Sequence, residues 1–104
     1  METKKLYFAT EENAYEGEKI GEFSNETELL NTLRECLSDD VDCEKSVEEN
    51  KETIDSLLED YEDGYIEFTN SHGYDVVYII TEDDEEAKRE FDALRREMIG
   101  AYDD

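Results

Sequence analysis

In four short stretches of the chain, apolar and aromatic residues stand close together between polar segments, which predicts β-strands. These stretches are residues 4–10, 19–23, 65–69 and 74–80. A polar stretch that ends at Gly17 separates the first two, and the segment Asn70–Gly73 separates the last two. In the second of these turns, Gly73 can supply the positive φ that a tight reversal needs. The pattern therefore predicts two β-hairpins.

Apolar residues recur at helical spacing in three longer stretches, which predicts amphipathic helices. We expect the first helix to begin after an N-cap at Ser24 or Asn25 and to end at an acidic loop over residues 38–44. The second helix is predicted over about 46–62, and the third over about 82–99 after Thr81. The buried stripe of the first helix comprises Leu29, Leu30, Leu33, Cys36 and Leu37.

The strand predicted over 74–80 has apolar residues on both faces. Val76, Tyr78 and Ile80 share one face, and Val77 and Ile79 share the other. Such a strand is covered on both sides, either by helices on both faces or by helices on one face and a second chain on the other. The sequence therefore predicts a single α+β domain over residues 1–104, with a three- to four-stranded, mostly antiparallel sheet packed with about three helices.

The net charge of the chain excludes more classes of function than the predicted fold does. The 104 residues include 33 acids and 10 bases, for a net charge of −23. Nucleic acids and anionic membranes are bound through Lys and Arg, so we expect neither as a direct ligand. A basic protein partner suits this charge. There is no apolar run long enough for a signal peptide or a membrane span, so we expect a cytoplasmic protein with reduced cysteines.

No arrangement of residues predicts catalysis, a metal or a cofactor. The single histidine, His72, lies in the predicted turn of the second hairpin, and Cys36 lies on the apolar stripe of its helix. A calcium loop over 59–70 would need oxygen ligands at its third position and a bidentate Glu at its twelfth. The chain has Tyr61 and Asn70 there. We therefore expect a protein that is not an enzyme and that holds neither metal nor cofactor.

The acids are concentrated in the middle of the chain. Residues 24–63 contain 15 acids and three bases, a net charge of −12. If 46–62 is one helix, five acids that are three or four positions apart fall within a stripe about 80° wide. They are Glu48, Glu52, Asp55, Glu59 and Asp63. Such like-charged neighbours cost a helix on the order of 1–2 kcal/mol over the row, and solubility needs far less charge than this.

A rigid row of carboxylates resembles a run of phosphates, and it would fit the Lys/Arg groove of a nucleic-acid-binding protein. In composition, the chain resembles the small acidic proteins with which phages block host defence, the anti-restriction and anti-CRISPR nucleic-acid mimics. That resemblance implies an inhibitor of a basic effector complex or nuclease, acting as a monomer or homodimer. The predicted partner-binding residues are Asp39, Asp40, Asp42, Glu48, Glu52, Asp55, Glu59, Asp63, Tyr61 and Tyr65.

Two other interpretations fit the same sequence. A bacterial immunity protein or antitoxin is acidic for the same reason when it neutralises a basic toxin, and only its partner differs. A small acidic domain whose charge has no binding role is the third interpretation, because a run of charges is usually a solvated face.

Overall fold

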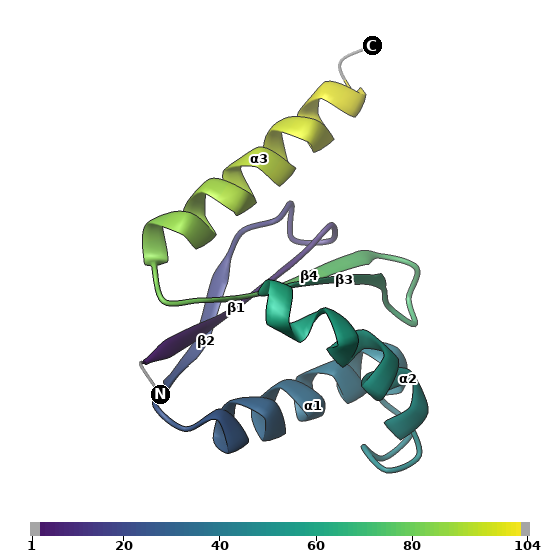
Figure 1. The fold of residues 1–104 in the computed structure, drawn as a ribbon. Coiled ribbons are helices and arrows are strands. Elements are labelled where there is room, and N and C mark those ends of the chain that lie inside the picture. The colour runs from purple at the N-terminus through teal and green to yellow at the C-terminus, as the bar shows by residue number, and fades with distance from the viewer. Residues whose placement is uncertain (1–2, 103–104) are drawn as a thin grey trace.

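The computed structural model describes the backbone of residues 3–102 and the side chains of residues 3–97. The strands form one four-stranded sheet, and helices lie on both of its faces (Figure 1). In chain order, the elements are β1 (Lys4–Thr10), β2 (Glu18–Phe23), α1 (Glu26–Asp42), α2 (Lys51–Leu57), the 3₁₀ helix η1 (Leu58–Asp63), β3 (Tyr65–Thr69), β4 (Asp75–Thr81) and α3 (Asp84–Tyr102). The α+β fold class predicted from the sequence is confirmed.

The sheet joins the two predicted hairpins side by side in the order β2-β1-β4-β3, and every neighbouring pair is antiparallel. The strands β1 and β4 are therefore central, and β2 and β3 form the edges. The pairing of β1 with β2 shifts by one residue between Leu6 and Tyr7, because Leu6 lies opposite Gly21 and Tyr7 opposite Lys19. This leaves Ile20 as the extra residue of a β-bulge.

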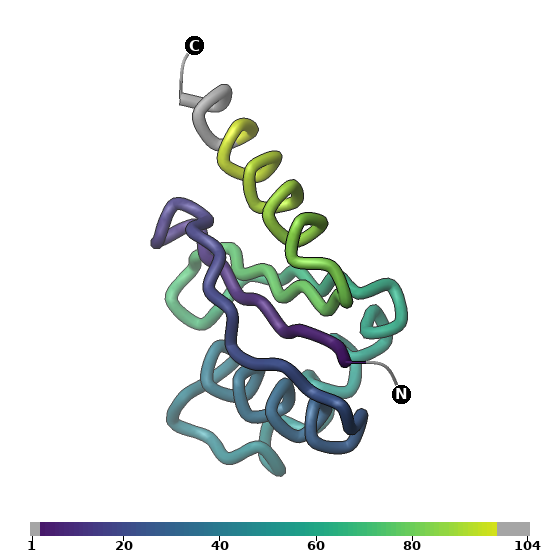
Figure 2. Tube along the Cα trace, turned by 90° about the vertical axis from the view of Figure 1, so that its left-hand side faces the viewer, coloured from purple at the N-terminus to yellow at the C-terminus, as the bar shows by residue number. Residues whose placement is uncertain are grey.

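Two hydrophobic cores lie on opposite faces of the sheet. One face packs on α1, α2 and η1, where Leu33, Leu37 and Ile54 meet Tyr78 of β4. The other face packs on α3, where Phe91 joins a cluster that includes Tyr7 and Ile79. Figure 2 shows the sheet between these layers, with α3 on one side and α1 and α2 on the other. Helices thus cover both faces of β4, one of the two arrangements that its apolar pattern predicted.

The three predicted helices differ from the observed ones at their ends. Asn25 caps α1 as expected, since its side chain accepts hydrogen bonds from the N–H groups of Thr27 and Glu28. However, α1 continues to Asp42. The predicted helix over 46–62 is wrong as a single element, because the chain forms a turn, then α2 and then η1. The third helix begins at Asp84, and Asp83 accepts a hydrogen bond from the N–H of Glu85.

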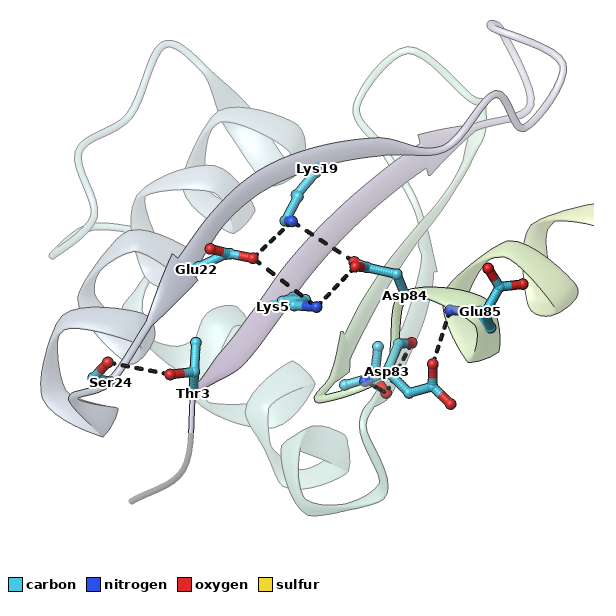
Figure 3. A network of polar contacts seen from close by, with 9 residues as sticks. Thr3, Lys5, Lys19, Glu22, Ser24, Asp83, Asp84 and Glu85 are labelled. Atoms are coloured by element: carbon cyan, nitrogen blue, oxygen red, sulfur yellow. Dashed lines mark hydrogen bonds and ion pairs between the residues drawn. The ribbon is translucent and has the colours of Figure 1, made fainter.

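Four charged side chains join β1 and β2 to the first turn of α3 (Figure 3). Lys5 Nζ lies 2.8 Å from Asp84 Oδ2, and Lys19 Nζ lies 2.8 Å from Glu22 Oε1. Longer contacts of 4.0 Å and 3.7 Å complete the network between the same four residues. Two of the few lysines are thus engaged with acids at this edge. Among the elements in residues 3–102, no helix is apolar over a length that could cross a bilayer.

Candidate functional surface

The acids of the predicted loop at 38–44 lie mostly on the last turns of α1, so the expected loop is corrected to a helix end. Asp39 is exposed there, while Asp40 and Asp42 are half-buried. No base occupies the last turn of α1. Negative side chains at this end face the negative pole of the helix dipole, an arrangement that costs stability. The exposed Asp39 therefore does not stabilise the helix, whereas the Asp42 carboxylate accepts a hydrogen bond from the N–H of Glu44.

Asp40 is turned toward the sheet. The Tyr78 hydroxyl donates a hydrogen bond to the Asp40 carboxylate, and the backbone C=O of Asp40 accepts from the N–H of Ser71 at 3.0 Å. Burial raises the pKa of Asp40, and the hydrogen bond from Tyr78 offsets part of that rise. The structure thus places this predicted contact residue in an internal contact between α1 and β4.

A buried amide fixes the corner between α1 and α2. Asn50 is 5% exposed, and its Nδ2 donates to the Ser38 hydroxyl at 2.9 Å and to the backbone C=O of Asp42 at 3.1 Å. The Asp42 carbonyl, which has no partner within the helix, thus accepts from Asn50 as well as from the Lys45 N–H at 3.1 Å. The side chain of Asn50 is therefore not used to cap α2, which begins one residue later. No pattern of residues around Asn50 predicts that it is buried.

The five acids predicted to form one helical row do not lie on one helix. Glu48 is in the turn before α2, Glu52 and Asp55 are on α2, and Glu59 and Asp63 are on η1. A 3₁₀ helix advances by about 120° per residue and an α-helix by about 100°. The larger rotation per residue in η1 turns Asp63 away from the direction of the other acids. The evenly spaced five-residue row is therefore wrong, although Glu52, Asp55 and Glu59 still follow one another on successive turns.

Although they do not form one row, the acids of this region are exposed in the structure. We call residues 44–63 the acidic segment; it contains nine acids and two bases. All nine acids are exposed, and none of them lies within ion-pair distance of a base in the described part of the chain. Lys45 lies 3.8 Å from Asp42 instead. The nine acids are Glu44, Glu48, Glu49, Glu52, Asp55, Glu59, Asp60, Glu62 and Asp63.

The two predicted contact tyrosines lie on opposite faces of the sheet. Tyr61 packs against the core beneath α1, with its hydroxyl oxygen buried and unpaired among the described atoms, and Lys4 Nζ lies 5.8 Å from its ring centroid. Tyr65 packs on the α3 side and donates a 2.9 Å hydrogen bond to Glu67. They therefore do not extend one common surface.

A groove between α1 and the acidic segment has no signal in the sequence. It has a volume of about 380 Å³ and is lined by Arg34, Val47, Glu48, Lys51, Ile54 and Asp55. Val47 is 37% exposed, which makes it one of the large apolar side chains at the surface. The groove places apolar contact area next to carboxylates, as interfaces commonly do. Arg34 precedes the other lining residues by 13 or more positions in the sequence. Only the fold of the α1–α2 corner brings them together.

Cys36 and His72 do not belong to this surface, whereas Cys43 is exposed at the C-terminal end of α1, next to the acidic segment. Cys36 packs against the core, and burial raises the pKa of its thiol. His72 is exposed in the turn between β3 and β4. Within the described residues, no three acidic, histidine or cysteine side chains converge as they would around a metal ion. Comparisons with models of protein families, with characterised proteins and with solved structures found no match for this chain.

Proposed function

We propose that this protein is an inhibitor whose acidic segment occupies the nucleic-acid-binding groove of a basic partner, an effector complex or nuclease of a bacterial defence system. One observation supports this proposal above the others: nine exposed carboxylates lie within 20 residues and none is paired with a base in the described structure. A surface that needs only solubility requires a modest net charge, about 2–8 for a small domain. The acidic segment alone has a net charge of −7.

The local structure supports the same proposal. The chain places the exposed Asp39 at the end of α1, where it opposes the helix dipole, and places Glu52 and Asp55 three residues apart on α2, where they repel each other. In contrast, Lys5 of β1 and Lys19 of β2 are matched with Glu22 and Asp84. Residues that break a local rule without a structural gain are expected where a protein binds its partner. Lys and Arg in the partner's groove would neutralise these carboxylates as they neutralise phosphates.

Capture and displacement together test the proposal. The protein is immobilised and exposed, at low salt, to a lysate of the bacterial host, and bound proteins are eluted with a salt gradient and identified by mass spectrometry. The purified partner is then given a fluorescent nucleic acid. We expect the acidic protein to displace this nucleic acid, with an apparent affinity that falls as salt rises. A captured partner that keeps its nucleic acid bound would contradict mimicry.

A matched pair of triple variants separates the acidic segment from net charge. Glu52→Lys, Asp55→Lys and Glu59→Lys together reverse three exposed acids of the acidic segment. Glu12→Lys, Glu16→Lys and Glu18→Lys together make the same change of net charge in the first hairpin, where all three residues are also exposed. We expect the first triple variant to lose displacement and the second to retain most of it. Equal losses would show that the location of the acids is irrelevant.

A further inference from the structure

The outer edge of β3 has unpaired backbone groups. The bonds from Ile80 N–H to Gly64 C=O (2.9 Å) and from Asn70 N–H to Tyr74 C=O (2.8 Å) set the alternation of the β3–β4 pair. Backbone groups of an antiparallel strand point to alternate sides. Tyr65, Glu67 and Thr69 therefore direct their N–H and C=O groups away from β4. Because β3 is an edge strand, these groups meet no further strand in the described structure.

The opposite edge is blocked, so the two edges differ. In β2, the bulge at Ile20 interrupts the regular backbone spacing, and Lys19 is held in the ion-pair network with Glu22 and Asp84. Bulges and lysines are the common means by which proteins prevent strand addition. The register of β3 runs without a shift from Tyr65 to Thr69, and β3 contains neither Lys nor Pro.

The surroundings of the β3 edge are negative. Between Lys51 and Lys88 the chain has 13 acids and no Lys or Arg. At the start of β3, a pocket of about 260 Å³ is lined by Tyr65 and Ile79 and by the carboxylates of Asp63, Glu86 and Glu90. Burial, followed by the neighbouring carboxylates of Glu67 and Glu90, raises the pKa of Tyr65. An aromatic ring among carboxylates is suited to a cationic side chain.

We propose that the β3 edge receives an extended segment of the partner that contains lysine or arginine, and that this segment adds to the sheet as a fifth strand. The proposal rests on the proposed function, since that function supplies a basic partner. An added strand lies about 4.8 Å from β3 and bonds to its unpaired backbone groups. Its alternate side chains lie on the α3 side of the sheet, opposite Tyr65 and Glu67, where Glu86 and Glu90 contribute further negative charge.

A defined peptide tests this proposal without knowledge of the natural partner. The isotope-labelled full chain is titrated, at low salt, with a capped decapeptide of alternating arginine and threonine, and backbone amides are followed by NMR. We expect the N–H groups of Tyr65, Glu67 and Thr69 to become protected from hydrogen exchange by about tenfold or more, because each gains a hydrogen bond. If these amides stay unprotected at millimolar peptide, the proposal is wrong.

Two substitutions at one position separate backbone pairing from charge. Glu67→Pro removes an outward N–H and leaves the bonds to β4, and proline is tolerated at such edge positions. Glu67→Gln removes the charge but keeps the N–H. We expect Glu67→Pro to weaken peptide binding about tenfold or more and Glu67→Gln only about two- to threefold. Equal affinities of Glu67→Pro and the wild type would overturn strand addition. The exchange measurement on the wild type decides the matter even if Glu67→Pro does not fold.

The outcomes also distinguish this proposal from the proposed function. If Glu67→Pro still displaces nucleic acid from the captured partner while the acidic-segment triple variant does not, the proposed function stands and strand addition is wrong. If the peptide protects the β3 edge but the captured partner keeps its nucleic acid, strand addition stands and mimicry is wrong. Protection of the same amides without peptide, rising with protein concentration, would identify a second copy of this chain as the occupant and overturn the proposal.

Discussion

At the scale of single residues, the half-buried carboxylate of Asp40 links the charge of the chain to its stability. Burial raises the pKa of Asp40 above its ordinary value, so its charged form is less favourable in the folded state than in the unfolded chain. A raised carboxyl pKa means that the folded state binds the proton more tightly. The associated stability is therefore present at low pH and is lost as pH rises through the folded pKa.

Asp40→Asn keeps an acceptor for the Tyr78 hydroxyl and removes the charge. At pH 7 we expect the variant to be more stable than the wild type, by no more than about 1 kcal/mol because solvent screens a half-exposed carboxylate. The difference should shrink as pH falls toward the folded pKa of Asp40, since the wild-type carboxyl then also becomes neutral. Urea unfolding at several pH values measures this difference. A variant that is less stable than the wild type at pH 7 would show that the charged hydrogen bond dominates.

Gly17 is the second residue whose role follows from contact. A Cβ atom at this position would overlap the ring of Phe91, which is 3% exposed in the core on the α3 side. We expect Gly17→Ala to lower the free energy of unfolding by about 1–3 kcal/mol, because an overpacked site must shift. The neighbouring Glu16→Ala is an exposed control and should change stability by less than about 0.5 kcal/mol. Chemical denaturation compares them, and adding Phe91→Leu to Gly17→Ala should restore part of the loss.

At the scale of elements, the residue pattern predicted the strands and α1 well. Short runs of apolar and aromatic residues located β1 and β4, and Leu29, Leu33 and Leu37 of the predicted stripe of α1 are buried, while Leu30 is half-buried. The prediction of a single helix over 46–62 was wrong because the apolar residues Leu57, Leu58 and Tyr61 suit both α-helical and 3₁₀ spacing. The late start of α2 depends on Asn50, whose amide binds the end of α1. Such a tertiary contact leaves no periodic signal in the sequence.

The same limits apply to the candidate surface. The exposure of the acidic segment could be predicted from its composition, because unpaired carboxylates are costly to bury. The contact of Asp40 with Tyr78 and the separation of Tyr61 from Tyr65 could not be predicted. Each depends on which strand or helix packs against the residue. The β3 edge was also beyond prediction, since strand order follows from how the two hairpins pair.

The two ends of α1 provide a matched test of its charge pattern. Asp39 is exposed near the C-terminal end, and Glu26 is exposed in the first turn. We expect Asp39→Lys to raise the free energy of unfolding by about 0.3–1 kcal/mol, since a cation suits the negative pole of the helix dipole. Glu26→Lys should lower it by a similar amount, although both variants change net charge equally. Urea unfolding at low salt compares them. A gain in both variants would mean that overall repulsion outweighs the dipole.

At the scale of the whole molecule, the net charge of −23 opposes the compact state, and its effect can be separated from that of the local contacts. The six ion pairs between described residues involve only four acids, so salt has few attractions to weaken and many repulsions to screen. Screening should therefore stabilise this fold, whereas it has little effect on a domain with balanced charges. The affinity for a basic partner should instead fall as the salt concentration rises.

We expect the melting temperature to rise by about 5 °C or more between 10 mM and 500 mM NaCl, because about 1 kcal/mol of relieved repulsion shifts a domain of this size by roughly 4–8 °C. KCl should act equally, since screening depends on ionic strength and not on a specific site. The acidic-segment triple variant should melt at a higher temperature in 10 mM salt and respond less to added salt. Thermal unfolding followed by circular dichroism measures each slope. A flat response in the wild type would mean that the carboxylates are already compensated, and an exposed, unpaired acidic segment would then no longer explain partner binding.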